Sequence, residues 1–368
     1  MRSRLRLRFF AHSWRSDWNH GNAHFLRGLA DELRKSGHEV RCYEPANAWS
    51  FVNLMQEPLA PRSLAQFRET FPDLSLQIFP PDDLSFLDDE LKDADLVVVH
   101  EWNSPELGNE ILRRKRRHDF RTLFHDTHHR SYTAPQQIGR FPIREFDGVL
   151  AFGDTIRRIY LEGFAARRAW TFHEAADTAH FFPRQNQPAT EISWIGNWGD
   201  DERTRELEEF LVEPLASVGR ARAAVYGVRY PENARRQLHT AGIEYRGYLP
   251  NLSAPDVYSR CALTLHIPRR CYANGLSGIP TIRMFEAFAC GVALICSPWN
   301  DLEGLFEPNA DYITVADGKA MTAQIAHLLR DDDARRQLAE HASQTIRRKH
   351  TCAHRARQFE EISEELGR

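Results

Sequence analysis

Hydrophobic and polar residues alternate at the start of the chain and then change to helical spacing. Residues 5–11 alternate and predict a strand, whereas residues 22–36 carry apolar side chains on one helical face. Gly37 ends this helix, and a second strand is expected at 38–43. A strand, a helix and a strand in this order predict a right-handed crossover between two parallel strands.

Short apolar runs continue this pattern along the chain. Residues 95–100, Asp-Leu-Val-Val-Val-His, are typical of a strand buried on both faces of a sheet. In the first half, a helix is predicted at 105–117 and strands at 121–125, 148–152 and 169–172. In the second half, an acidic helix is predicted at 202–215 and strands at 192–196, 223–226, 244–246, 263–267, 292–296 and 312–315. Two alternating series predict an α/β protein with two Rossmann-like domains.

The domain boundary is expected in the polar segment 174–188, which ends in Pro-Arg-Gln-Asn-Gln-Pro. We predict an N-terminal domain at 1–173 and a C-terminal domain at 189–345. The remaining residues, 346–368, predict a helix that returns to the N-terminal domain.

Composition narrows the function. The chain has 368 residues with 48 basic and 51 acidic side chains, so its net charge of -3 predicts no nucleic-acid partner. No apolar run reaches 18 residues, so no integral membrane segment is predicted. The six cysteines form no CxxC pair and no metal-ligand spacing, which predicts no metal site and a reduced, cytoplasmic setting. The basic run 113–117 predicts a solvated helix end, with weak attraction to an anionic membrane surface as the alternative.

The most informative segment is 280–297, Pro-Thr-Ile-Arg-Met-Phe-Glu-Ala-Phe-Ala-Cys-Gly-Val-Ala-Leu-Ile-Cys-Ser. It predicts a helix, a tight turn at Gly291 and a buried strand. Glu286 can accept hydrogen bonds from two ribose hydroxyls, and Arg283 offers a planar fork to a phosphate. The alternative is an ordinary helix and strand with a surface glutamate.

This segment resembles the donor-binding signature of GT-B glycosyltransferases. It is particularly similar to the group related to spore-maturation glycosyltransferases, whose pattern is R-x-F-E-A-x-A-C-G. The matching positions are Arg283, Phe285, Glu286, Ala287, Ala289, Cys290 and Gly291. The resemblance implies the GT-B fold, in which two parallel sheets face a central cleft, with the acceptor side in the N-terminal domain and the nucleotide sugar in the C-terminal one.

One departure from the related retaining enzymes concerns their E-x7-E motif. Its second glutamate falls on Glu286, but its first falls on Gly278. The contacts of the donor sugar, and retention or inversion at its anomeric carbon, are therefore left open.

The same resemblance implies further donor contacts. Gly196 and Asn197 lie in the glycine turn that approaches the donor diphosphate, and Arg203 follows at the next helix, where a solvated role is the alternative. Tyr248 and Leu249 offer backbone groups to the base. Arg269 begins a loop that is expected either to close over the sugar or to be a mobile surface loop.

Two strand ends in the first half carry candidate catalytic groups. His125 and Asp126 end one predicted strand, on the side where open α/β sheets bind ligands. Either side chain can move a proton, and the alternative for Asp126 is a helix cap. His100 and Glu101 end a neighbouring strand and are candidate acceptor contacts.

The loop His12 to Gly21 combines aromatic and polar side chains that suit a sugar. Trp14 and Trp18 are candidate stacking residues, and Gly21 can admit an acceptor at a helix start. Asp17 is a candidate base for an inverting reaction. The alternative is a loop that buried tryptophans hold in place.

Taken with the resemblance, these motifs predict a metal-independent glycosyltransferase of hexosyltransferase type, with no cofactor beyond the nucleotide-diphosphate sugar. The acceptor, a glycan, a lipid or a small molecule, is not identified. Alternatives are a nucleotide-sugar epimerase or a phosphorylase of the same fold, and a non-catalytic nucleotide-sugar-binding component of a surface assembly. Dehydrogenase and P-loop motifs do not occur.

Overall fold

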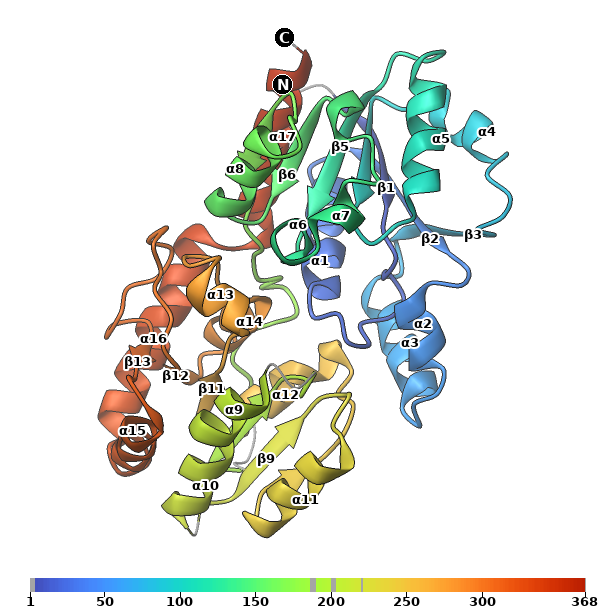
Figure 1. Ribbon diagram of the computed structural model, residues 1–368. Coiled ribbons are helices and arrows are strands. Elements are labelled where there is room, and N and C mark those ends of the chain that lie inside the picture. The colour runs from blue at the N-terminus through green and yellow to red at the C-terminus, as the bar shows by residue number, and fades with distance from the viewer. Residues whose placement is uncertain (1–3, 186–189, 200–202, 220, 368) are drawn as a thin grey trace. The chain divides into compact units, whose positions relative to one another are not determined.

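Two parallel sheets organise the protein in the computed structural model (Figure 1). The structure describes residues 4–185, 190–199, 203–219 and 221–367. The chain divides into two compact units, called unit 1 (1–174 with 352–368) and unit 2 (175–351).

Unit 1 contains a seven-stranded sheet with the order β3-β2-β1-β4-β5-β6-β7, in which all neighbouring strands are parallel. The strands are β1 (Arg6–Phe10), β2 (Glu39–Pro45), β3 (Ser75–Phe79), β4 (Leu96–His100), β5 (Arg121–Asp126), β6 (Gly148–Ala151) and β7 (Ala169–Thr171). The strand order reverses between β1 and β4. Open α/β sheets bind ligands outside the carboxyl ends of the strands at such a reversal.

Helices cover this sheet. They are α1 (Ala23–Lys35), α2 (Trp49–Leu54), α3 (Ala60–Thr70), α4 (Leu87–Leu91), α5 (Pro105–Lys115), α6 (Arg130–Thr133), α7 (Pro135–Ile138), the 3-10 turn η1 (Ile143–Glu145), α8 (Asp154–Glu162) and α17 (Cys352–Gly367). Local sequence sets their starts: Ser104 accepts a hydrogen bond from Leu107 N, and Pro105 opens α5.

The last helix, α17, lies among the elements of unit 1 although it ends the chain (red in Figure 1). It packs on α1, and Phe359 is fully buried against Phe9 and Phe172. Polar contacts fix the helix as well, because Glu360 bonds His38 at 3.2 Å and Gln358 donates to Thr171 O at 2.9 Å.

Unit 2 contains a six-stranded parallel sheet with the order β10-β9-β8-β11-β12-β13. The strands are β8 (Ile192–Ile195), β9 (Ala223–Tyr226), β10 (Glu244–Tyr245), β11 (Leu263–His266), β12 (Ala293–Cys296) and β13 (Ile313–Thr314). The helices are α9 (Thr204–Leu207), the π-helical turn η3 (Glu208–Val212), α10 (Glu213–Val218), α11 (Glu232–Thr240), the 3-10 turn η4 (Asn251–Ser253), α12 (Ala254–Tyr258), α13 (Arg270–Asn274), α14 (Ile282–Ala289), α15 (Gly318–Arg330) and α16 (Asp332–Lys349).

The fold class is predicted correctly as two Rossmann-like α/β domains with parallel sheets. The single acidic helix predicted at 202–215 is instead divided into α9 and α10 by the π turn η3. This turn comes just before Pro214, which lacks the N–H that a regular α-helix requires. Residues 200–202, which include the end of the predicted loop and the first residue of that helix, and linker residues 186–188 lie outside the described ranges. No helix in the described ranges combines the length and the apolar character needed to cross a membrane.

Candidate functional site

Glu286 is the best-defined polar residue of the signature segment. It lies in the middle of α14 and is fully buried. Its Oε1 accepts a hydrogen bond from Asn251 Nδ2 at 2.7 Å, and its Oε2 pairs with Arg283 NH1 at 2.5 Å. Asn251 was not predicted, because it comes from η4, 35 residues earlier in the chain. The carboxylate is therefore fixed in position before any ligand arrives, while its ribose contact stays a prediction.

Phe285, predicted as a donor contact, lies in the core of unit 2. Its ring is fully buried and contacts Phe306 at 5.3 Å and His350 at 5.9 Å between centroids. Consecutive helix residues point about 100° apart, so Phe285 and Glu286 face different surroundings. The structure gives Phe285 a packing role.

Gly291 ends the signature helix. Its φ of +67° is in the left-handed region, and a Cβ at this position would lie 3.0 Å from Pro183 Cγ. Glycine is the residue that meets both conditions, since it carries no Cβ.

The glycine turn after β8 makes close backbone contact with the loop after β9. A Cβ on Gly227 would lie 2.0 Å from Gly196 O, and Val228 N donates to Asn197 Oδ1 at 2.8 Å. Gly227 N also donates to Gly247 O at 2.8 Å. The turn at Gly196 and Asn197 is thereby tied to the loop that precedes Tyr248.

Two arginines lie against this turn. The Arg203 side chain donates to Asn197 O at 3.2 Å and to Ile267 O, so it joins the loops after β8 and β11. Arg203 is only 9% exposed, so it is not the solvated helix residue of the alternative interpretation. Arg269 NH2 would lie 2.8 Å from a Cβ on Gly199, which places its guanidinium over the glycine turn.

The loop predicted to meet the base contains one buried and one half-buried residue. Tyr248 is 7% exposed, whereas Leu249 is half-buried. At the start of α14, the Nε2 atom of His266 bonds Thr281 Oγ1 at 3.0 Å. Burial lowers the pKa of His266 to about 3, so this imidazole is neutral at pH 7.

Gly278, where the related enzymes place the first glutamate of their motif, has a φ of +95°. A Cβ there would lie 3.1 Å from Glu303 N and from Glu303 Cγ. The backbone conformation and the neighbouring side chain both favour glycine, which explains why a glutamate does not occur at this position.

In unit 1, Asp126 and Glu101 form a buried carboxyl pair at the ends of β5 and β4. Tyr160 donates to Asp126 Oδ2 at 2.6 Å and His128 N to Oδ1 at 2.8 Å, while Arg130 NH2 pairs with Glu101 at 2.8 Å. Burial raises the pKa of Asp126, and burial together with the nearby Asp126 raises that of Glu101 well above its ordinary value. The pair therefore favours holding a proton. Asp126 fixes the turn before α6 and does not cap that helix directly.

Four buried histidines cluster near the carboxyl ends of β1, β4 and β5. Ring centroids of His100 and His125 are 5.5 Å apart, those of His12 and His100 are 5.6 Å apart, and those of His12 and His20 are 4.4 Å apart. Burial lowers the pKa of all four, to about 3 for His20 and His125. They are neutral at pH 7. No three His, Cys, Asp or Glu side chains in the described ranges are placed to hold a metal ion.

His12 and His20 belong to the loop after β1 that the sequence indicates for a sugar, but neither was predicted individually as a contact. Their signal in the sequence was the loop itself, since residues 12–21 combine aromatic and polar side chains that suit a sugar. The loop lies between β1, which ends at Phe10, and α1, which begins at Ala23. Arg130 was also missed, since it enters the site through its pairing with Glu101.

The loop after β1 is held on the buried Glu44. Glu44 Oε2 accepts from Trp14 N at 2.7 Å, and the Trp14 ring is fully buried. Asp17 pairs with Arg27 at 3.3 Å, and Trp18 donates to Glu57 at 2.7 Å. Burial of Trp14 matches the alternative in which tryptophans fasten the loop. Gly21 lies half-buried, two residues before α1 begins.

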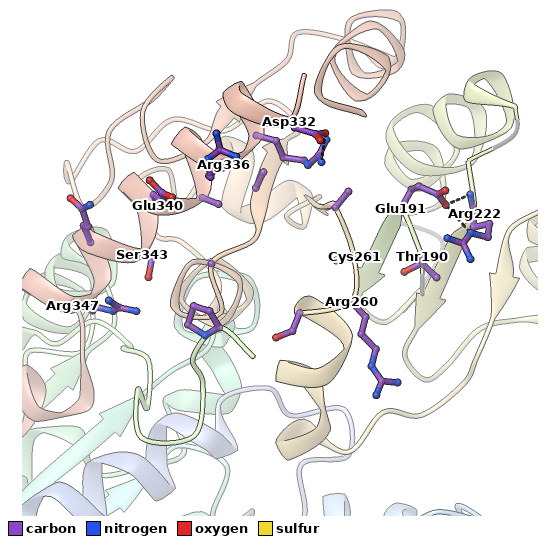
Figure 2. Close-up of a pocket in the computed structure, with 18 residues that line it drawn as sticks. Thr190, Glu191, Arg222, Arg260, Cys261, Asp332, Arg336, Glu340, Ser343 and Arg347 are labelled. Atoms are coloured by element: carbon purple, nitrogen blue, oxygen red, sulfur yellow. Dashed lines mark hydrogen bonds and ion pairs between the residues drawn. The ribbon is translucent and has the colours of Figure 1, made fainter. Parts of the chain in front are cut away.

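A cavity of about 700 Å³ opens at the opposite edge of the unit 2 sheet. Thr190 precedes β8, Arg222 precedes β9 and Cys261 precedes β11. Figure 2 shows Ser343 and Arg347 of α16 on one side and Arg260 on the other. Because the glycine turn and Arg269 follow the strands, this cavity is separate from the predicted donor site.

Residues 203–361 match a family model described as glycosyl transferase-like. A comparison with curated proteins gives no significant match.

Solved structures of glycosyltransferases share the fold over nearly the whole chain. Sucrose-phosphate synthase from Thermosynechococcus elongatus aligns with a TM-score of 0.66 at 14% identity, covering 99% of each chain. HepE from Anabaena, in complex with UDP and glucose, aligns with a TM-score of 0.68 at 12% identity, covering 98% of this chain and 100% of its own. A glycosyltransferase from Rickettsia africae has a TM-score of 0.67 at 11% identity, covering 99% of each chain.

These findings define the class of protein. The fold is that of the GT-B enzymes, and the family match covers α9 to α16 and part of α17. The predicted resemblance is therefore confirmed: the chain has the GT-B fold, and its residues 203–361 match the glycosyl transferase-like family.

Proposed function

We propose that the protein transfers a sugar from a UDP-sugar to a hydroxyl group of an acceptor, with the donor bound by unit 2 and the acceptor by unit 1. The observation that carries this proposal is the buried Glu286 carboxylate, which Asn251 and Arg283 fix within the region of the family match. HepE, which shares the fold, is described in complex with UDP-glucose, and this supports uracil as the base.

Glu286 binds the ribose hydroxyls in this proposal. A carboxylate accepts up to about four hydrogen bonds, so it can receive vicinal hydroxyls in addition to its protein donors. Its fixed position lowers the entropic cost of binding. Tyr248 and Leu249 contribute backbone groups to the base.

The diphosphate lies between the glycine turn and α14. Arg269 is placed over that turn, and Arg283 is in the first turn of α14, where the helix dipole also favours negative charge. These groups stabilise the charge that develops on the leaving UDP, so we propose a metal-independent reaction.

His125 contacts the reacting sugar or acceptor in unit 1. Its Nε2 is buried without a hydrogen-bond partner among the described residues. A pKa of about 3 makes it a weak base, so the neutral imidazole serves as a hydrogen-bonding group. Asp126 positions the end of β5 through Tyr160 and His128 N.

The test is acceptor-dependent release of UDP. UDP-glucose, UDP-galactose and UDP-N-acetylglucosamine are incubated with saccharide and lipid acceptors, with and without EDTA, and free UDP and new glycosides are quantified. We expect UDP and glycoside in equal amounts at a rate that EDTA leaves unchanged. Formation of an epimeric UDP-sugar without UDP release would support the epimerase, and donor binding without either product would support the binding component.

A further inference from the structure

The cavity at the amino edge of the unit 2 sheet is lined by arginines and small side chains, and all of its lining residues belong to unit 2. Its volume of about 700 Å³ is within the range of about 300–1,000 Å³ that is typical of small-molecule sites. The segments that precede β8, β9 and β11 form one side, and one face of α16 forms the other (Figure 2).

We propose that this cavity binds a phosphate monoester, either a soluble one such as a sugar phosphate or the headgroup of a lipid such as phosphatidic acid. The inference goes beyond the proposed function, because it concerns a site other than those of the donor and the acceptor.

The charged groups that line the cavity leave an excess of positive charge. They are five arginines and three acidic residues. Arg222 pairs with Glu191 at 3.3 Å and Arg335 pairs with Asp332 at 2.6 Å, so these charges largely neutralise each other.

Two of the lining arginines have no acidic partner within the described ranges. They are Arg260, which directly precedes Cys261 at the start of β11, and Arg347 near the end of α16. Figure 2 shows these two side chains on different sides of the cavity. An anion bound between them gives both guanidinium groups a counter-ion.

Ser343 adds an unpaired hydroxyl beside Arg347. The two residues are four positions apart in α16, so their side chains are neighbours on one face of the helix. Ser343 is 6% exposed, and its Oγ is buried without a hydrogen-bond partner among the described residues. An unpaired buried hydroxyl is costly, so a ligand oxygen that accepts its proton gains affinity.

Together these three groups match a phosphate. Each guanidinium fork donates two parallel N–H bonds to a pair of oxygens, and the serine hydroxyl donates one more. A terminal phosphate has three oxygens and up to two negative charges for them. A carboxylate has only two oxygens and one charge, and an uncharged ligand leaves both arginines without a counter-ion.

The rest of the cavity suits the organic part of an ester. A volume of about 700 Å³ greatly exceeds the roughly 30 Å³ of a water molecule, so it holds more than an inorganic ion. Glu340 also lines the cavity, seven residues before Arg347, which is about 10 Å along the helix. At that distance its carboxylate can accept from hydroxyl groups of the ester while the phosphate lies at Arg347.

This cavity and the predicted donor site lie at opposite ends of α14. Gly291, which follows the end of that helix, lines the cavity, whereas Arg283 is in the first turn. An ester and a nucleotide sugar can therefore be bound at the same time.

The experiment uses the full chain. Glucose 6-phosphate and glucose are titrated by calorimetry, and vesicles of phosphatidylcholine with or without phosphatidic acid are tested by co-sedimentation. R347A and R260A each remove one guanidinium group, and S343A removes the hydroxyl. R348A is the matched control, because Arg348 is the exposed neighbour of Arg347 in α16 and does not line the cavity. UDP-glucose is titrated into the same proteins to follow the donor site.

We expect the unmodified protein and R348A to bind glucose 6-phosphate or the phosphatidic acid vesicles, and the probe that binds identifies the source of the phosphate. Affinity falls about tenfold in R347A and in R260A and about threefold in S343A, while R347A keeps its affinity for UDP-glucose. Equal binding of the ester in R347A, R260A and R348A, binding of glucose as tight as that of its phosphate, or no binding of either phosphate probe would overturn the inference. Ester binding that depends on Arg347, without any binding of UDP-glucose, would instead contradict the proposed function alone.

Discussion

At the residue scale, burial determines what the polar groups of both units can do. Glu286 and His125 are 0% and 1% exposed, so a ligand that reaches either one replaces little water. Hydrogen bonds formed in such surroundings are stronger than those made at the surface. The same burial keeps the four histidines of unit 1 neutral, which suits binding to hydroxyl groups.

Neutral buried histidines also make stability depend on pH. The folded pKa of His125 is about 3, against an ordinary value of 6.5, so the unfolded chain binds this proton more readily below pH 6.5. Stability from this residue is complete above pH 6.5 and is lost as pH falls toward 3, by about 1.4 kcal/mol per pH unit.

We therefore predict that the free energy of unfolding, measured with urea, falls less in H125N than in the unmodified protein when the pH is lowered from 7.5 to 5.5. The expected difference between the two decreases is about 1.4 kcal/mol. H239N, at an exposed position in unit 2, controls for the substitution itself. An equal loss in H125N and the unmodified protein would show that His125 is not a buried neutral group.

The sequence predicted some of these residues and missed others for a physical reason. Glu286 and His125 were found because each lies in or next to an apolar run with a recognisable local pattern. Asn251 and Arg130 contribute through contacts made by folding, and no local pattern marks them. His12 lies in a loop that suits a sugar, but the pattern does not single it out from the other residues of that loop. For Trp14 the sequence left two roles open, because an aromatic residue in a polar loop can be either a ligand contact or an anchor, and its burial favours the anchor.

At the scale of elements, strongly apolar strands were predicted within one or two residues. β4 and β12 are buried along their whole length, which a continuous apolar run indicates. β3 was missed, because it lies at the sheet edge with only Phe79 buried. An edge strand exposed on both faces leaves no hydrophobic pattern to read.

The end of α14 allows a direct test of the signature glycine. G291A adds a Cβ to a left-handed residue, at a cost of about 1–2 kcal/mol, and also brings it within 3.0 Å of Pro183 Cγ. Gly242 is the matched control, with a φ of +71° and nothing within 4 Å of its Cβ position. We expect chemical denaturation to show a larger loss of stability for G291A than for G242A. Equal losses would mean that the contact with Pro183 has no energetic effect.

At the scale of the whole molecule, the chain builds each site from loops that follow several strands of one sheet. In unit 2, Gly196 and Gly227 bring the loops after β8 and β9 together. Arg203 bonds the loop after β11, and His266 at the end of β11 bonds Thr281 at the start of α14. In unit 1 the strand reversal brings the ends of β1, β4 and β5 together. Parallel strands place all their carboxyl ends at one edge, which is why the site's general position follows from the fold class.

The arrangement of the chain itself has a further consequence. The sheet of unit 1 is complete by residue 171, yet α17 covers part of it from the end of the sequence. The composition of the last residues, rich in Arg, Glu, Ala and Leu, predicts this helix. The face that it covers is fixed by particular contacts, such as Phe359 with Phe9 and Glu360 with His38.

The central claim is that Glu286 of unit 2 binds the nucleotide of the donor. Isothermal titration of UDP into the unmodified protein, E286Q and D311N tests it most directly. Asp311 is the matched control, since it is a buried carboxylate of unit 2 that accepts from Thr345 Oγ1 at 2.9 Å, outside the donor loops. We predict that E286Q weakens UDP binding at least about tenfold, or ~1.4 kcal/mol, and that D311N changes it by less than about twofold. Equal UDP affinity in E286Q and the unmodified protein would contradict the account.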